Sequence, residues 1–310
     1  ATSNIGLGTN AINSITTGDD NVGLGDDAGT AITTGHRNVF LGWEAGKATT
    51  TGSNNIAIGK FAFGTNTTGG TNVAIGVSAL DANTTANDNT AIGYNSLSAN
   101  TTGHSNTAAG ALSLDANTTG DYNTAFGVIA LSSNTTAHEN TALGRASMEN
   151  STTGSANTAV GYSSLRINTT GTNNTAVGMT AMYANTTGAY NVAVGKAALD
   201  ANTTASGNTA IGNAAMGTNT TGANNVAIGN SALFANTTAS NNTAVGKSAL
   251  TANTTGTSNT AMGDEAMKSN TTMSNNSAFG RRALYTCAQS ANHTALGYFS
   301  LYSNTTGQQN

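Results

Sequence analysis

Four aspartates near the amino end are the residues whose type and spacing come nearest to a metal site. Asp19, Asp20, Asp26 and Asp27 lie close together in the sequence, and calcium takes oxygen ligands. Their spacing is not that of an EF-hand, and the sequence lacks the Gly-Gly-x-Gly-x-Asp repeat of calcium-binding β-rolls. We therefore expect solvated carboxylates rather than a calcium site.

Histidine and cysteine add little further chemistry. His36, His104 and His138 are expected to be exposed loop residues, with His104 and His138 too far apart to share a metal, and His293 is expected to be structural. The single cysteine, Cys287, excludes an intrachain disulfide and a cysteine-based zinc cluster. No Ser-His-Asp, Cys-His, paired-carboxylate or phosphate-loop pattern recurs, so we predict neither catalysis nor a bound cofactor.

Threonine and tyrosine offer a more regular candidate surface. Asn-Thr-Thr triplets recur thirteen times between Asn66 and Asn304, and each is formally a glycosylation sequon. Glycans on rungs about 5 Å apart would collide, so we favour a corner at which the Asn side chains form a hydrogen-bonded ladder. Paired Thr rows are also typical of ice-binding solenoids, and Tyr rings can stack on sugars. The residues of such a ligand face would include Thr84, Thr85, Thr101, Thr102, Tyr94 and Tyr162.

These residues recur because the chain repeats one 17-residue unit. From Asn4, eighteen complete units follow without insertion or deletion, with the pattern Asn-Thr-Ala-Ile-Gly-x-x-Ala-Leu-x-Ala-Asn-Thr-Thr-Gly-x-x. We number the positions of a unit from 1 to 17. Position 5 is always Gly, which marks a backbone conformation or a close approach that a Cβ would prevent. Structural roles are expected for Gly8, Gly93, Gly195 and Gly297 at position 5, Ile92 at position 4, Leu97 at position 9, and Asn83, Asn100 and Asn202 at position 12.

The apolar positions predict one short strand per unit. Position 4 is large and apolar in every unit except that of Ala109, and position 2 is Thr or a β-branched aliphatic residue in nearly all units. Alternation along a strand places positions 2 and 4 on one face and the Ala of position 3 on the other. We expect positions 4 and 9 to form two inward rows, and the small residues at positions 3 and 8 to allow another chain to approach closely.

The predicted fold is all-β: a parallel β-solenoid of eighteen 17-residue coils. A content of 8% charged and 5% aromatic residues argues against a conventional globular core, while the low charge and the absence of proline argue against disorder. Frequent Gly, Asn and Thr disfavour helices. At about 4.8 Å per coil, the rod would be roughly 85 Å long. We expect one solenoid domain over 1–310, with coils over 4–309 and atypical capping or junction coils at 4–37 and 276–292.

A homotrimer is expected because one thin coil buries few large side chains. Ordering seventeen residues costs about 1.5 kcal/mol each, which two or three buried apolar side chains do not offset. The net charge of −4, without a basic run or a long apolar run, predicts no contact with nucleic acid or with a membrane. Because Asn310 begins a further repeat, we expect this sequence to be a piece of a longer chain.

The Asn-Thr-Ala-Ile-Gly segment at 89–93 and 208–212 resembles the head repeats of trimeric autotransporter adhesins. Those heads are left-handed parallel β-rolls with a Ser-Val-Ala-Ile-Gly strand at a shorter period. The full unit, with Ala-Leu and Asn-Thr-Thr-Gly, is also similar to repeats of bacterial and phage tail-fibre-like proteins that end in a self-cleaving endosialidase-type chaperone. The resemblance covers essentially the whole chain and implies a left-handed, trimeric fibre.

The expected function is therefore structural or adhesive: the non-catalytic shaft or head of an extracellular fibre, on a cell surface or attached to a virion. Its main partner would be further copies of itself, as a homotrimer or a filament, and its ligand would be a host-surface receptor or a glycan. Two alternatives stay open. One is an ice-binding or glycan-binding solenoid that uses the Thr or Tyr rows, and the other is a self-assembling filament or sheath subunit.

Overall fold

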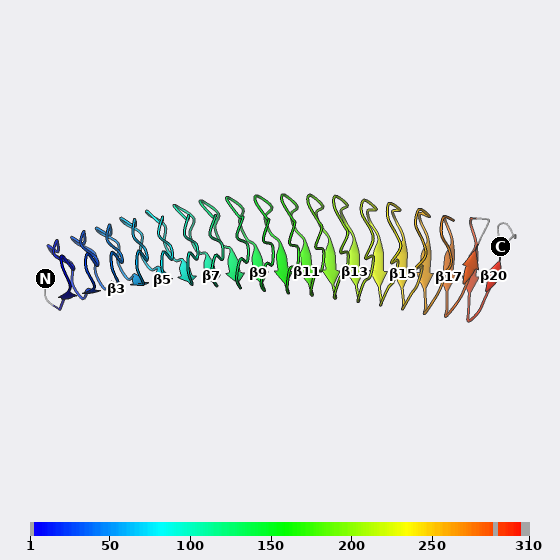
Figure 1. Cartoon of the computed structure of the whole chain (residues 1–310). Helices are drawn as coiled ribbons and strands as arrows, with labels where there is room; N and C mark the ends of the chain where they lie inside the picture. Colours follow the sequence, from blue (N-terminus) through cyan, green and yellow to red (C-terminus); the bar gives the residue numbers. More distant parts are fainter. Residues whose placement is uncertain (1–2, 288–290, 305–310) are drawn as a thin grey trace. The chain divides into compact units, whose positions relative to one another are not determined.

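The computed structural model describes residues 3–287 and 291–304, and this part of the chain contains strands and turns but no helix. It forms two compact units, which are divided in the sequence between Ala156 and Asn157. Each unit is described by itself. Figure 1 shows that, within each unit, every coil carries its strand in the same place.

The first unit contains nine three-residue strands, one per coil. Each strand pairs in parallel with the next, and the paired residues are 17 apart in the sequence. The strands are β1 (Ile5–Leu7), β2 (Val22–Leu24), β3 (Val39–Leu41), β4 (Ile56–Ile58), β5 (Val73–Ile75), β6 (Thr90–Ile92), β7 (Thr107–Ala109), β8 (Thr124–Phe126) and β9 (Thr141–Leu143).

The second unit repeats this arrangement. Its parallel strands are β10 (Thr158–Val160), β11 (Thr175–Val177), β12 (Val192–Val194), β13 (Thr209–Ile211), β14 (Val226–Ile228), β15 (Thr243–Val245), β16 (Thr260–Met262), β17 (Ser277–Phe279) and β19 (Thr294–Leu296), and the short β18 (Thr286–Cys287) pairs with β20 (Ser303–Asn304). The register of 17 residues holds in both units, so the predicted parallel β-solenoid is confirmed.

The Gly at position 5 ends each strand. Its φ is about +130° throughout, with 129° at Gly8, 134° at Gly93, 131° at Gly195 and 119° at Gly297, a region that L side chains rarely adopt. A Cβ on Gly93 would lie 2.6 Å from the carbonyl oxygen of Gly110 in the next coil. Both the conformation and the close stacking of coils therefore require glycine here.

The core lies on the side of the strand opposite to the predicted one. Ala91 at position 3, Ser96 at position 8 and Leu97 at position 9 are completely buried, whereas Ile92 at position 4 is 43% exposed. The inward row at position 9 is confirmed. The inward row at position 4 is wrong, and so is the idea that positions 3 and 8 face another chain, because their side chains fill the narrow interior of their own coil.

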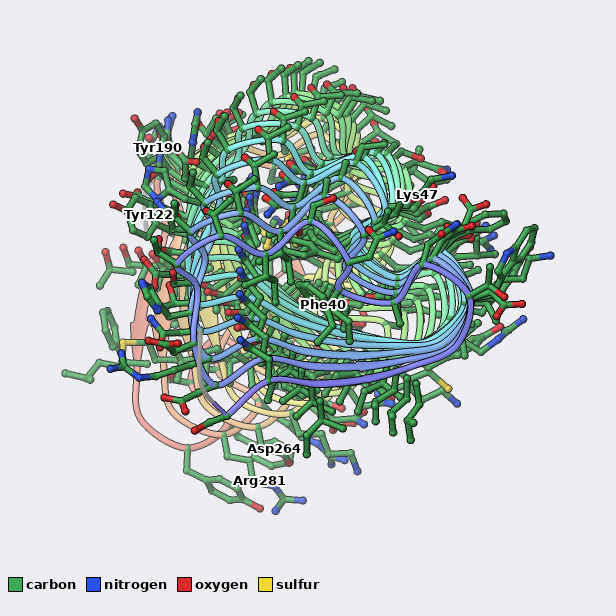
Figure 2. The ribbon with its side chains drawn as sticks, turned by 90° about the vertical axis from the view of Figure 1, so that its left-hand side faces the viewer. Phe40, Lys47, Tyr122, Tyr190, Asp264 and Arg281 are labelled. Atoms are coloured by element: carbon green, nitrogen blue, oxygen red, sulfur yellow. The ribbon has the colours of Figure 1, made fainter. Side chains whose placement is uncertain are left out.

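Complementary volumes explain why Ala occupies position 3. Position 3 is Phe only at Phe40, which is completely buried, and position 9 is Gly only at Gly46, in the same coil, and at Gly29, in the preceding one. A Cβ on Gly46 would lie 2.6 Å from the Phe40 ring, and one on Gly29 would lie 2.7 Å from it. Figure 2 shows Phe40 inside the coils. A large residue fits at position 3 only where position 9 supplies the space, because protein interiors are close-packed.

Two columns of buried asparagines join successive coils. In the first Asn ladder, at position 1, Asn106 donates its main-chain N–H and its side-chain amide to Oδ1 of Asn89, at 2.9 and 3.3 Å. In the second, at position 12, Asn100 Nδ2 donates to Oδ1 of Asn83 at 3.2 Å. Both ladders also donate to position 15, where the Gly103 carbonyl accepts from Asn89 and Asn100. The ladder predicted for the Asn-Thr-Thr corner is confirmed.

The second unit has a ladder of the same kind at position 12, where Asn202 Nδ2 donates to Oδ1 of Asn185 at 2.8 Å. Because these Asn side chains are completely buried and their amide nitrogens donate to protein oxygens, the folded solenoid offers no room for a glycan on them. The recurring Asn of the Asn-Thr-Thr triplet is thus explained by its structural role, because its buried amide forms the hydrogen bonds that a buried polar group requires.

Candidate functional site

The most extensive candidate site is the outward side of the strands. We call the side chains at positions 2 and 4 of all coils the outer strand face. In the first unit, position 4 carries Leu7, Leu24, Leu41, Ile58, Ile75, Ile92, Ala109, Phe126 and Leu143. In the second unit it carries Val160, Val177, Val194, Ile211, Ile228, Val245, Met262, Phe279 and Leu296.

The position-4 row of this face is apolar although it is partly or fully exposed to solvent in the single chain. Within the first unit the exposed fraction is 36% at Ile58, 43% at Ile92 and 46% at Phe126, and within the second it is 38% at Ile211 and 40% at Met262. Positions 2 and 4 carry no Asp, Glu, Lys or Arg in any coil. An outward sheet face is usually polar, and large contiguous apolar patches mark interaction sites. The outer strand face therefore has the character of an interface.

Exposed aromatic side chains follow directly after the strands, at position 6. Tyr94 is 55% exposed in the first unit, and Tyr162 is 47% exposed in the second. Trp43 contacts Phe61 with ring centroids 4.9 Å apart, and the Lys60 ammonium lies 4.5 Å from the centroid of the Trp43 ring. These side chains add apolar surface two residues beyond position 4, but they form no regular row of rings.

The Thr pairs do not form a flat double row. They lie in a bend of the coil and not in a strand. Thr84 and Thr101 are part-buried, and their hydroxyls donate to the carbonyl oxygens of Thr101 and Thr118 in the following coils, at 3.2 and 3.0 Å. Thr85 and Thr102 are exposed. The first Thr of such a pair thus joins neighbouring coils, and only the second Thr faces water.

The acidic cluster of the first coils is tied to its neighbours rather than arranged around a cation. Asp26 Oδ1 accepts from the main-chain N–H of Thr9 at 2.8 Å, and Asp27 Oδ1 accepts from Asn10 at 3.1 Å. Residues 3–287 and 291–304 contain no group of three His, Cys, Asp or Glu side chains that could hold a metal ion.

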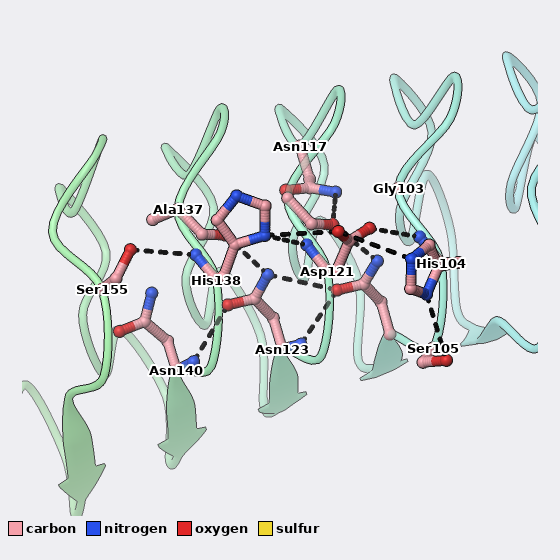
Figure 3. A network of polar contacts seen from close by, with 12 residues as sticks. Gly103, His104, Ser105, Asn117, Asp121, Asn123, Ala137, His138, Asn140 and Ser155 are labelled. Atoms are coloured by element: carbon pink, nitrogen blue, oxygen red, sulfur yellow. Dashed lines mark hydrogen bonds and ion pairs between the residues drawn. The ribbon is translucent and has the colours of Figure 1, made fainter.

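The histidines at position 16 have a structural role that the sequence analysis missed. The Asp121 main-chain N–H donates to His138 Nδ1 at 3.0 Å, and the His104 N–H donates to Asp121 Oδ1 at 2.8 Å (Figure 3). Asp121 Oδ2 lies 3.6 Å from His104 Nε2 and 3.4 Å from His138 Nδ1. His36 accepts from the Asp19 N–H in the same way, at 3.0 Å. The sequence signal for this role was the frequent occurrence of Ser, Asn, Asp and His at position 16, because each of these side chains can accept a hydrogen bond from the main chain of a neighbouring coil.

His293 and Cys287 end the two ladders near the carboxyl end of the second unit. His293 is buried at position 1, and its main-chain N–H still donates to Asn276 Oδ1 at 3.0 Å. Cys287 is buried at position 12, where most coils carry Asn. The expected structural role of His293 fits this place in the first Asn ladder.

Charged and aromatic side chains take over the surface of these last coils. Glu265 accepts hydrogen bonds from Lys268 and Arg282, and these two bonds lower its pKa to about 2. The Arg282 guanidinium lies 5.8 Å from the centroid of the Tyr285 ring, and Tyr285 stacks on Tyr302 at 5.0 Å. The positive charge of Arg282 is thus paired within the chain, so this cluster has the character of a cap rather than of an anion site.

No cavity opens in the surface of the described residues, and none of their segments is a helix long and apolar enough to cross a membrane. The site that the geometry supports is therefore an extended face and not a pocket. Comparison with known proteins found neither a family model nor a curated protein that matches this chain.

Proposed function

We propose that this chain is a non-catalytic segment, shaft or head, of an extracellular fibre of the adhesin or tail-fibre type, and that three copies of the chain form this fibre. The observation that carries the proposal is the outer strand face, which is apolar at position 4, free of charged residues at both positions, and partly or fully exposed in the single chain. Burial of apolar surface is the main driving force of association. A fibre of several chains accounts for this face, and a monomeric rod does not.

The size of the face supports association of several copies. Its two side chains per coil present on the order of 100 Å² of surface, so nine coils of one unit would bury roughly 900 Å² per copy. A trimer divides this area between two neighbours, roughly 450 Å² for each, so the faces of both units are needed to reach the area of about 800 Å² per partner in a standard interface. The resemblance to the trimeric adhesin heads supports three copies and a place outside the cell. The regular stacking of coils in each unit supports a mechanical role, in which the rod holds another element away from a surface.

The mass in solution tests this proposal. We expect light scattering after size exclusion to give three times the chain mass of 30.7 kDa. Replacing Ile92 by Asp places a charge in the outer strand face and should shift the protein toward the monomer, because an unpaired buried charge is costly. Thr102→Asp is the matched control, since Thr102 is exposed but lies outside this face, and it should leave the mass unchanged. A wild-type chain that is monomeric at tens of micromolar would refute the proposal.

A further inference from the structure

Charged side chains are confined to five of the seventeen positions of the repeat. The ten Lys and Arg and the fourteen Asp and Glu residues all lie at positions 6, 7, 10, 16 or 17. Within the first unit, Figure 2 shows Tyr122, at position 17, and Lys47, at position 10, on opposite sides of the core residue Phe40. None of the charged positions belongs to the outer strand face, so the charges lie outside the surface that the proposed fibre buries.

The two units carry net charges of opposite sign. The first unit has eleven Asp and Glu against four Lys and Arg, a net charge of −7, whereas the second has three against six, a net charge of +3. Two first units repel each other, and so do two second units, but a first unit attracts a second unit. Charge complementarity therefore selects the second unit of another copy as a partner for the first unit.

Two carboxylates of the first unit are available to such a partner. Asp88 and Glu139 are exposed at position 17 of coils that are three repeats apart, and Ser105 and Tyr122 occupy this position in the two coils between them. Asp88 accepts a hydrogen bond from the Thr71 hydroxyl, and neither carboxylate forms an ion pair within the described residues. We call Asp88 and Glu139 the acidic pair.

Two lysines of the second unit have the same spacing. Lys196 and Lys247 are exposed at position 6 of coils that are also three repeats apart, with the neutral Asn213 and Asn230 between them. Neither lysine forms an ion pair in the part of the chain that the structure describes. We call them the basic pair. Three coils correspond to roughly 14 Å at about 4.8 Å per coil, so the two cations are as far apart as the two anions.

We propose that the acidic pair of one fibre docks on the basic pair of another, so that assembled fibres associate side by side. The equal spacing lets both ion pairs form at once, and the residues between them are neutral on both surfaces. Tyr122, which is 58% exposed between the two carboxylates, adds apolar contact area. The contact uses no residue of the outer strand face, so it goes beyond the proposed function and does not depend on how many copies form one fibre.

The chemistry of the contact determines its strength. A single exposed ion pair contributes little, but a fibre of several copies presents several pairs, and multivalent binding strengthens a weak contact. Each chain brings one acidic and one basic pair, so the contact is heterologous and can continue from one fibre to the next. Exposed charges are screened by salt. The association is therefore reversible and requires low ionic strength.

Light scattering at two salt concentrations tests the contact on the full chain. At roughly 10 mM salt, where the screening length is about 30 Å, we expect species larger than one fibre whose mass increases with protein concentration. At roughly 300 mM salt, where the screening length is below about 10 Å, we expect single fibres only. Equal masses under the two conditions would overturn the proposal.

A spacing variant provides a control of unchanged charge. Asn230→Lys combined with Lys247→Asn moves one cation by one coil, so that the basic pair is two repeats apart instead of three. The net charge, the composition and position 6 itself stay the same. We expect the association at low salt to be at least about tenfold weaker, because only one of the two ion pairs can form at a time. An unchanged association would show that the spacing plays no part.

Charge reversal followed by mixing identifies the two surfaces. Asp88→Arg with Glu139→Arg removes the acidic pair, and Arg37 shows that position 17 accepts arginine. This variant changes the net charge from −4 to zero, which in general promotes association, whereas the proposed contact predicts single fibres. Lys196→Glu with Lys247→Glu removes the basic pair and should also give single fibres. A mixture of the two variants should associate, because each supplies the pair that the other lacks.

The outcomes separate this inference from the proposed function. A mixture that does not associate, or a neutral variant that associates more strongly than the wild-type chain, overturns the contact and leaves the fibre standing. A monomeric mass at high salt overturns the fibre, while the measurements at low salt still decide whether the acidic and basic pairs of two chains meet.

Discussion

At the scale of single residues, the repeat is most strictly constrained at position 5. Every coil has Gly there with φ near +130°, and at Gly93 and most of its equivalents, though not at Gly297, a carbonyl group of the next coil lies where a Cβ would be. The two constraints are independent: the first concerns the conformation of one residue, and the second concerns the separation of two coils. Either alone would favour glycine, and together they explain why no other residue occupies this position.

Gly93→Ala is therefore expected to destabilise the chain strongly. Its Cβ would lie 2.6 Å from the carbonyl oxygen of Gly110, and the backbone would be held at φ 134°. We expect a loss of about 3 kcal/mol or more in the free energy of unfolding, measured by urea denaturation followed by circular dichroism. Gly70→Ala, at position 16, is the control because its φ is not positive, the nearest atom to an added Cβ lies 3.0 Å away, and Ala189 and Ala223 occupy that position in other coils. Equal losses for the two variants would contradict a special role of position 5.

A second prediction at this scale concerns carboxyl groups at position 10. Asp200 is part-buried, and its Oδ1 is buried without a hydrogen-bond partner. Burial raises the pKa of Asp200 above its usual value of 3.8. A raised pKa in the folded state means that the charged form opposes folding. This cost is fully present above the folded-state pKa and disappears as the pH falls toward 3.8.

Asp200→Asn should therefore stabilise the chain at pH 7, by up to about 1 kcal/mol after allowance for solvent screening. The gain in Tm should shrink as the pH is lowered to about 4, where the wild-type carboxyl also loses its charge. Glu139→Gln, which removes an exposed negative charge at position 17, controls for the change in net charge. A gain that is the same at both pH values would show that burial of the charge is not its cause.

At the scale of the elements, the sequence was sufficient to predict the period, the parallel strands, the position-9 core row and the Asn ladder. It was not sufficient to predict which strand face points inward. Alternation along the strand places positions 2 and 4 on one face and position 3 on the other. Position 3 and position 4 are both apolar, so alternation alone does not tell which face is buried. The expectation that large apolar side chains are buried favoured position 4, and it was wrong. The decisive signal was the coupling of Phe40 with Gly29 and Gly46, which shows that positions 3 and 9 share one volume.

The outer strand face was missed for the same reason. Since Ile92 and its equivalents were expected inside, no exposed apolar surface remained, and the Thr and Tyr rows became the candidate ligand face. The position of the Thr pairs in a bend could not be read from their spacing, because the same triplet could also lie in a strand. The hydrogen bond from Thr84 to the Thr101 carbonyl was likewise not predictable from residue type alone.

The Asn ladders give a prediction at this scale. Asn100→Ala removes a donor to Asn83 and to Gly103 and an acceptor for Asn117, all in a buried setting. Because each buried polar group left without a partner costs about 1–3 kcal/mol, we expect a total loss of about 3 kcal/mol in stability. Asn134→Ala should cost clearly less, since the next coil carries Ser151 at this position and Asn134 Oδ1 is buried without a hydrogen-bond partner, so this variant leaves no donor of the following coil unpaired. Equal costs at the two positions would mean that the ladder adds nothing beyond single hydrogen bonds.

At the scale of the whole molecule, each coil of a unit depends only on the coils next to it. The hydrogen bonds described above lie within one coil or join it to a neighbouring coil, and in the described part of the chain the strands of the main sheet pair with those of neighbouring coils. Stability of such a repeat protein is close to a sum of coil contributions and interfaces between neighbours. The fold is then stabilised by the stacked columns of equivalent residues rather than by any single contact, and coils can be added or removed without changing the others.

A deletion in multiples of the repeat tests this description. Removing residues 89–105, one complete coil, joins Asp88 to Asn106 and keeps every remaining residue in its column. We expect a folded β-protein with a single cooperative transition and a Tm within a few degrees of the wild-type value. Removing only residues 89–96 leaves nine residues of that coil, so the Asn, Gly and Leu residues before the deletion no longer lie over those after it, and the columns are interrupted there. That variant should lose the single cooperative transition and begin to unfold at a clearly lower temperature than the variant without residues 89–105. If both deletions were tolerated alike, identical residues would not need to stack at intervals of seventeen, and the columns described here would not be what holds the solenoid together.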